Sequence, residues 1–168
     1  MSAKTLSRMA LLSSVMLVLS YIERQIPAVS VIPGIRLGLA NTVLLYAIYL
    51  MRPKAAWALM IIKVGIAGLV YLNGMAMAFS LGGGALSLAV MYLARQVKGI
   101  SIVGVSILGA VFHIAGQLGA AALIVHVRPD ALMAVLPLYM ALSAATGLIT
   151  GIAAKYVNAA LEKSGWTK

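Results

Sequence analysis

The chain has 168 residues, of which 63% are hydrophobic and only 10% are charged, and its mean hydropathy is +1.06. This composition excludes a water-soluble globular domain, because water would not solvate so much apolar surface. The net charge of +10 does not indicate a nucleic-acid-binding protein, since the basic residues stand singly or in pairs between apolar runs. Without cysteine, the chain alone cannot build a disulfide, an iron–sulfur cluster or a thiolate metal site.

Six apolar segments predict an all-α integral membrane protein, a compact bundle of six transmembrane helices of ~20 residues each in a single domain over 1–168. The first segment follows Lys4 and Arg8, but it ends in a Tyr-Ile-Glu-Arg sequence unlike a signal-peptide cleavage site, so we expect it to remain as a helix. A proline-stiffened loop with Pro27 and Pro33 precedes the second segment. The predicted spans are about 5–22, 37–51, 55–72, 78–94, 102–125 and 131–156.

The fourth and fifth segments are rich in glycine. The run Gly82-Gly83-Gly84 falls in the first turns of the predicted fourth span, where it permits either close approach of another helix or a break. The fifth span carries Gly109 and Gly116, which also permit close packing.

The basic residues are distributed unequally between the two sides of such a bundle. Nine fall on one side and three on the other, while Lys63 lies within a span. The positive-inside rule then predicts a plasma (inner) membrane protein with both termini in the cytoplasm. The nine are Lys4, Arg8, Arg52, Lys54, Arg95, Lys98, Lys155, Lys163 and Lys168, and the three are Arg24, Arg36 and Arg128.

Lys63 is the most informative polar residue, because a charge in the middle of a span costs roughly 2.5–3.5 kcal/mol on insertion scales. Only three acidic residues exist, and Glu23 at the end of the first span is the one within reach of a long lysine side chain. Two interpretations stay open. Lys63 either faces a ligand with Glu23 as a counter-charge, or it pairs with Glu23 and locks two helices together.

Further polar candidates lie on the second and fifth spans. His113 and Gln117 are four residues apart and share one helical face, where they contact either a substrate or a neighbouring helix. They make a weak metal site, because no further imidazole, thiolate or carboxylate ligand stands at helical spacing. Asn41 in the second span has the same two interpretations. Arg36 stands where that span enters the membrane, where it either attracts an anion or anchors the helix.

Three stretches together resemble the Gx transporter family, also labelled heptaprenyl diphosphate synthase component I-like. They are the stretch from Pro33 to Asn41, the sequence Phe-Ser-Leu-Gly-Gly-Gly over 79–84, and the stretch from Gly104 to Gln117 with its His-x-x-x-Gln. Members of the family resemble the substrate-binding S components of energy-coupling factor transporters. The resemblance covers nearly the whole chain and implies an S-component-like fold that captures a small molecule from outside.

The resemblance also implies a partner, a coupling transmembrane protein with cytoplasmic ATPases that docks on the first helix. Many S components carry an Ala-x-x-x-Ala pattern at that place, and this chain has Ala10 followed by Ser14. The chain has no Gly-x-x-x-x-Gly-Lys-[Ser/Thr] phosphate loop, so it does not hydrolyse ATP itself. Prenyl synthase activity is not expected, because chain elongation needs clustered aspartates that hold magnesium, and the chain has Asp130 as its one aspartate.

The first hypothesis is therefore a substrate-binding membrane subunit without cofactor, energised by a partner. A membrane subunit of a quinone- or flavin-linked electron-transfer assembly is the second, because His113 is able to hydrogen-bond a quinone carbonyl. A third is a solitary ion-coupled carrier that uses Glu23, Lys63 and His113 as a relay. In each case the lipid bilayer is the surrounding medium and no nucleic acid is bound.

Overall fold

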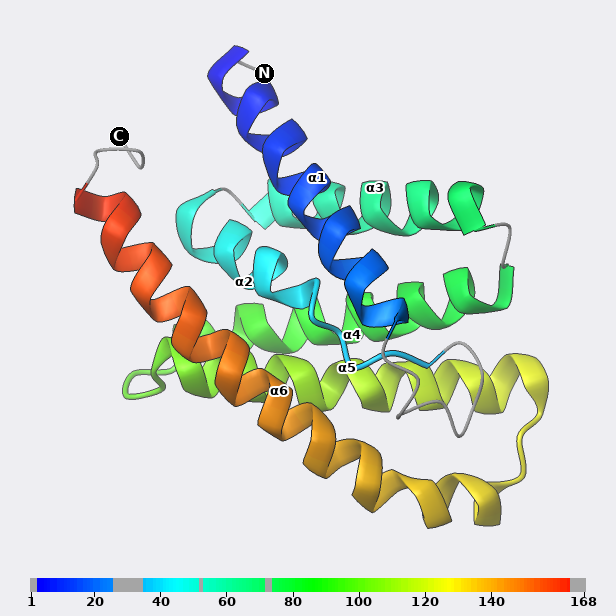
Figure 1. The fold of residues 1–168 in the computed structure, drawn as a ribbon. Coiled ribbons are helices and arrows are strands. Elements are labelled where there is room, and N and C mark those ends of the chain that lie inside the picture. The colour runs from blue at the N-terminus through cyan, green and yellow to red at the C-terminus, as the bar shows by residue number, and fades with distance from the viewer. Residues whose placement is uncertain (1–2, 26–34, 52, 72–73, 164–168) are drawn as a thin grey trace.

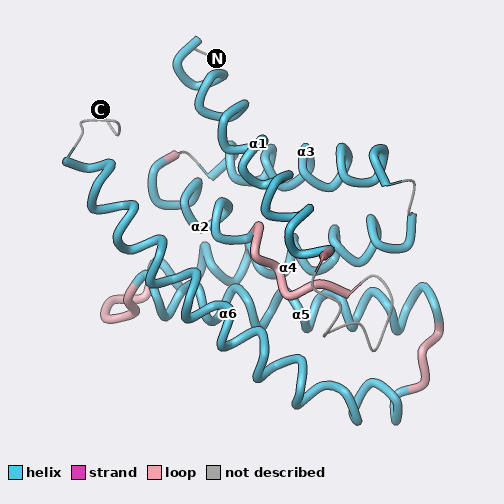
Figure 2. The backbone as a smooth tube through the Cα atoms, viewed as in Figure 1, coloured by secondary structure: helices cyan, strands magenta, loops and turns pink. Residues whose placement is uncertain are grey.

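The computed structural model describes residues 3–25, 35–51, 53–71 and 74–163, and all regular structure in these ranges is α-helical (Figures 1 and 2). Five of the helices are long and apolar enough to cross a membrane, which confirms the predicted all-α, multi-pass membrane fold. The six helices are α1 (Ala3–Arg24), α2 (Asn41–Leu50), α3 (Pro53–Tyr71), α4 (Gly74–Gln96), α5 (Ile102–Val125) and α6 (Pro129–Lys163).

The second predicted span differs from the structure. In place of one helix over 37–51, residues 35–40 run without helical structure and the ten-residue α2 follows. At 1.5 Å per residue α2 is about 15 Å long, half of a bilayer core. The predicted proline loop over 26–34 lies outside the described residues.

The short helix α2 lies at the centre of the molecule. It contacts each of the other five helices, and seven of its ten residues are buried. In Figure 1, α3, α4 and α5 run side by side, while α1 crosses α3 obliquely and α6 runs diagonally across α5. The apolar core therefore gathers around α2, with Leu44, Leu45 and Ile48 packed against Met16 of α1 and Leu59 of α3.

Glycines bring α4 and α5 into close contact. A Cβ on Gly116 would lie 2.5 Å from the carbonyl oxygen of Gly82, and a Cβ on Gly82 would lie 3.0 Å from the carbonyl oxygen of Gly116. The helix α4 begins at Gly74 and continues without interruption through the glycine run. Of the two roles open to these glycines, the structure therefore shows close helix approach.

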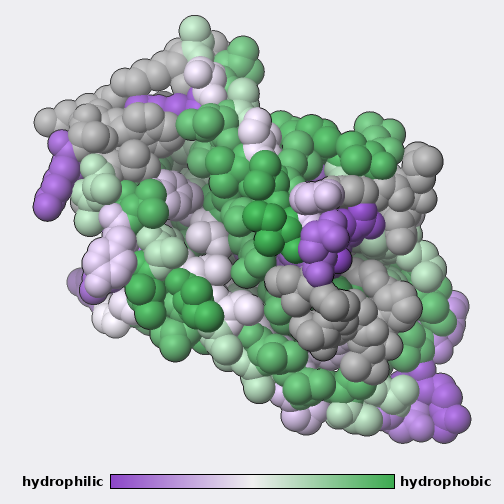
Figure 3. Space-filling model, viewed as in Figure 1, coloured by the Kyte–Doolittle hydropathy of each residue, from purple (hydrophilic) through white to green (hydrophobic). Residues whose placement is uncertain are grey.

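The surface of the bundle is apolar, as a lipid-facing surface must be. Large exposed apolar side chains occur on each of the five long helices, for example Leu11, Leu69, Leu93, Leu123 and Ile149. On the face drawn in Figure 3, hydrophobic side chains cover most of the described surface. The start of α1 and the end of α6 lie toward the same end of the bundle as the turn between α4 and α5 (Figure 1).

The close contact at Gly116 predicts that alanine substitutions at two glycines of α5 have different effects on stability. Gly116→Ala should lower the free energy of unfolding by about 1–3 kcal/mol, because the new methyl group meets backbone atoms of α4 that cannot move aside. Gly119→Ala is the matched control, since nothing lies within 4 Å of its Cβ position, and it should be neutral or raise stability by up to ~1 kcal/mol. Thermal unfolding of both purified variants in detergent measures this, and equal melting temperatures would contradict the close contact.

Candidate functional site

A non-helical segment, residues 35–40, passes through the interior and organises the polar residues around it. Figure 2 draws this segment as a loop between helices, and its residues Ile35, Leu37, Gly38 and Ala40 are all buried. Gly38 has φ +88°, a left-handed conformation that non-glycine residues rarely adopt. Irregular backbone at membrane depth is tolerated only where the protein itself supplies hydrogen-bond partners.

Gln117 of α5 supplies two of those hydrogen bonds. Its Oε1 accepts the backbone N–H of Arg36 at 2.8 Å, and its Nε2 donates to the carbonyl oxygen of Arg36 at 2.9 Å. The two backbone groups fix the orientation of the amide, because a backbone N–H only donates and a carbonyl only accepts. One side chain thus satisfies both backbone polar groups of the half-buried Arg36.

The same amide determines the tautomer of His113. The second Nε2 hydrogen of Gln117 faces the His113 Nε2 atom at 2.5 Å, so that ring nitrogen is the acceptor. The ring proton of the neutral imidazole then lies on Nδ1, which is buried against Gly83 of α4. His113 is therefore a neutral imidazole that accepts a hydrogen bond from Gln117, one turn further along α5.

Glu23, at the end of α1, reaches the segment from the opposite side. Its side chain is buried, its Oε1 accepts the N–H of Gly38, and the N–H of Leu39 also faces the carboxylate. Lys63 of α3 and Arg36 interact with this carboxylate through their charges. The salt bridges found among the described residues do not include a Glu23–Lys63 pair within 4.0 Å, but the charges of the two side chains interact.

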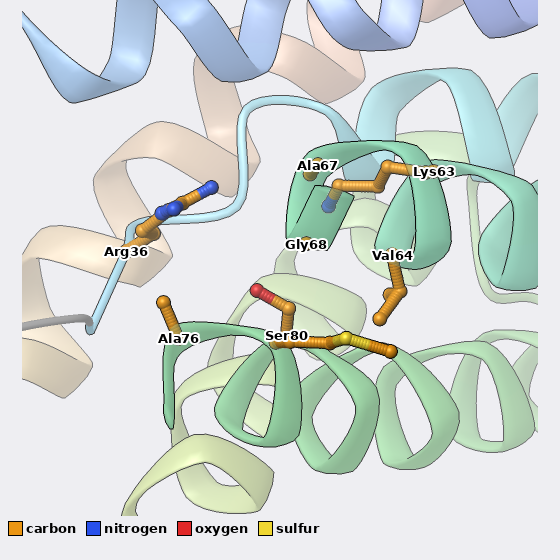
Figure 4. A pocket seen from close by; sticks show the side chains of 8 residues that line it. Arg36, Lys63, Val64, Ala67, Gly68, Ala76 and Ser80 are labelled. Atoms are coloured by element: carbon orange, nitrogen blue, oxygen red, sulfur yellow. The ribbon is translucent and has the colours of Figure 1, made fainter. Parts of the chain in front are cut away.

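Lys63 and Arg36 border a small cavity between α3, α4 and the segment. Figure 4 shows the Lys63 ammonium and the Ser80 hydroxyl directed into the space that Arg36 borders from the segment. Val64, Ala67, Gly68, Ala76 and Met77 complete the lining. The cavity measures about 10 Å³, roughly the room that one water molecule needs.

The structure brings five of the six predicted residues into one network. Arg36, His113 and Gln117 are joined by hydrogen bonds, and Glu23 and Lys63 join them through Gly38 and through charge.

Asn41 is buried as well, but it lines a different cavity on α2 and is separate from the one that Lys63 borders. The proposed docking residues Ala10 and Ser14 are exposed on α1, where the Ser14 hydroxyl donates to the Ala10 carbonyl at 3.0 Å.

Sequence reasoning missed two parts of this network. The N–H of Gly38 is the main partner of Glu23, and Ser80 contributes a hydroxyl to the charged cavity. Ser80 had a detectable signal, since a serine in an apolar span needs a partner. The role of Gly38 gave no such signal, because the group involved is a backbone N–H, which every residue except proline carries.

A family model described as heptaprenyl diphosphate synthase component I matches residues 12–157. The chain belongs to this family. The match covers most of the chain and confirms the resemblance to the Gx transporter family. No curated protein and no solved structure matches the chain. Together, the family and the apolar helical fold establish a multi-pass membrane component.

The name of the heptaprenyl diphosphate synthase component I family mentions a synthase, but the described residues offer no metal-binding cluster. Among them, no three His, Asp or Glu side chains come together in a way that could hold a metal ion. Asp130 forms an exposed ion pair with Arg128 at 2.8 Å.

The tight packing around Gly38 predicts that a single methyl group there is poorly tolerated. A Cβ would lie 2.7 Å from His113 Cδ2 and 2.8 Å from Asn41 Nδ2, in addition to the strain of the positive φ. Gly99→Ala is the matched control, with φ +97° and nothing within 4 Å of the Cβ position. Both variants should lose about 1–2 kcal/mol of stability from backbone strain, and Gly38→Ala should lose ~1–3 kcal/mol more. If thermal unfolding gave equal losses, the contact with His113 would be wrong.

The hydrogen bonds of Gln117 predict that two glutamine-to-methionine variants differ in stability. Gln117→Met keeps the volume of the side chain but leaves the N–H and C=O of Arg36 without partners, each at about 1–3 kcal/mol. Gln96→Met removes an exposed glutamine whose Nε2 donates to the Tyr92 carbonyl at 3.2 Å, and it should change stability by less than ~0.5 kcal/mol. Chemical or thermal unfolding in detergent distinguishes the two variants. A Gln117→Met protein as stable as wild type would argue against the two hydrogen bonds between Gln117 and Arg36.

Proposed function

We propose that the protein is a substrate-binding membrane subunit that takes up a small anionic molecule. The observation that carries the proposal is the charge of the buried cluster. Lys63 and Arg36 both border the cavity, and the charge of each interacts with the Glu23 carboxylate. A buried cation such as Lys63 is costly inside a bundle, and an anionic ligand in the cavity would offset part of that cost.

The lining of the cavity contains two cationic residues and no carboxylate. The sequence contains only three acidic residues. Glu23 interacts with both cations through its charge, and Asp130 is paired with Arg128 at the exposed start of α6. A carboxylate or phosphate group suits such a lining, because ammonium and guanidinium groups both form charged hydrogen bonds with it.

The size of the cavity sets a condition for uptake. With room for about one water molecule, it accepts a small molecule only when side chains around it move apart. The part of the non-helical segment that carries Arg36 is the natural moving part, because side chains of Gln117 and Glu23 hold its N–H groups and no helical ladder does.

Energy for release into the cell would come from a partner. In this proposal a coupling transmembrane protein with cytoplasmic ATPases docks on the exposed face of α1 that includes Ala10 and Ser14. The more basic side of the bundle, to which the sequence pattern assigns Arg8, Lys54, Arg95, Lys98, Lys155 and Lys163, would face the cytoplasm of a plasma-membrane protein, as the positive-inside rule requires.

A charge-removing variant tests the proposed site. First, native mass spectrometry of gently purified protein identifies the small molecule that co-purifies. Lys63→Met should then weaken binding of that molecule at least about tenfold, since a charged hydrogen bond contributes ~1.5–3 kcal/mol. Lys54→Met at the exposed start of α3 is the matched control and should bind as wild type does.

The Lys63→Met protein should remain folded, because it loses the cost of burying the Lys63 charge while Glu23 keeps the N–H of Gly38 and the charge of Arg36. Unchanged affinity in this folded variant would remove Lys63 from the site. A co-purifying quinone or flavin would support an electron-transfer subunit instead. Transport by the chain alone in liposomes, abolished when a proton gradient is dissipated, would support a solitary carrier.

A further inference from the structure

A second polar cavity lies between the start of α2 and helices α4, α5 and α6, apart from the one bordered by Lys63. It also measures about 10 Å³. Its lining includes the Asn41 amide, the hydroxyl-bearing residues Thr42, Ser106, Thr146 and Thr150, and the side chain of Met91. Neither the charged residues nor Gln117 belong to it.

Asn41 is the feature that needs an explanation. Its side chain is 6% exposed, and neither its Nδ2 nor its Oδ1 atom has a hydrogen-bond partner among the described residues. A buried amide without partners is strongly unfavourable in a protein interior. Since the amide borders the cavity, a small polar group in the cavity would satisfy both of its ends.

The hydroxyl groups around the cavity have already used their protons. Thr42 Oγ1 donates to the Leu39 carbonyl at 2.7 Å, and Thr146 Oγ1 donates to the Ser143 carbonyl at 2.9 Å. Thr150 Oγ1 donates to the Thr146 carbonyl at 2.8 Å and lies 3.2 Å from Ser106 Oγ. These oxygens therefore offer lone pairs, while the Asn41 Nδ2 offers two N–H donors.

We propose that Asn41 and the surrounding hydroxyls form a binding site for one water molecule. Water accepts from the Asn41 N–H and donates to the hydroxyl lone pairs or to Asn41 Oδ1, and the volume suits one molecule. A cation fits less well, because it would meet the amide N–H groups and the positive end of α2. An anion would meet the hydroxyl lone pairs. The inference is independent of the proposed substrate.

The water would join three helices at a functional position. Asn41 is the first residue of α2, directly after the segment with Arg36 and Gly38, whereas Ser106 belongs to α5 and Thr146 to α6. A molecule bonded to these residues fixes the start of α2 against the other two helices. It therefore holds in place the end of the non-helical segment.

Radiolytic footprinting tests the site, because hydroxyl radicals formed from a bound water oxidise a neighbouring methionine to its sulfoxide. Met91 lines the cavity and is 1% exposed, while Met16, which is 0% exposed in the apolar core, is the internal control. Mass spectrometry after X-ray exposure of the purified protein should show Met91 oxidised at least about fivefold faster than Met16. Equal, slow rates for the two methionines would overturn the proposal.

Variants link the water to Asn41. Asn41→Leu should reduce the oxidation rate of Met91 to that of Met16, and the isosteric Thr146→Val should reduce it too, which keeps the test available if the first variant does not fold. Asn158→Leu, an amide removed elsewhere on α6, is the matched control and should leave the rate unchanged. Fast oxidation of Met91 in folded Asn41→Leu and Thr146→Val proteins would show that these residues do not hold the water.

Discussion

The peptide groups of residues 35–40 must find hydrogen-bond partners inside the protein, because hydrocarbon offers none. Gln117 meets this constraint for Arg36 by matching both its N–H and its C=O, as a neighbouring strand would. Glu23 meets it for Gly38. Helices α1 and α5 are thus held to the same short stretch of chain, and the cluster of buried polar residues forms around that stretch.

Glycines make room for this arrangement where helices and segment meet. His113 lies between Gly38 of the segment and Gly83 of α4, and a Cβ on either glycine would come within 3 Å of its ring. The close contact of Gly82 and Gly116 brings α4 against α5 just beyond it. Backbone thus packs directly on imidazole from two sides, which holds the ring in the orientation that accepts from Gln117.

Charge and hydrogen bonding divide the interior into two polar regions with different chemistry. The cavity beside Lys63 and Arg36 is lined by two cations and no carboxylate, and this lining is the physical basis for the proposal of an anionic substrate. The cavity beside Asn41 and Thr146 is lined by neutral groups that can donate and accept. An apolar bundle retains such groups only where each contributes to structure or to binding.

The sequence by itself determined the solvent and the fold class, because 63% hydrophobic residues in six runs leave a membrane bundle as the one way to bury them. It also identified Lys63, His113 and Gln117 as important, since polar residues in apolar spans stand out without any structure. Only the tertiary structure showed that 35–40 is not helical, because the apolar period of 37–51 suits a helix and the competing bonds come from Gln117 and Glu23, far away in the chain. Only the tertiary structure showed that Asn41 lies at a different cavity from Lys63. The chain changes direction at Gly38, and the side on which a following residue lies depends on long-range packing that no local sequence pattern records.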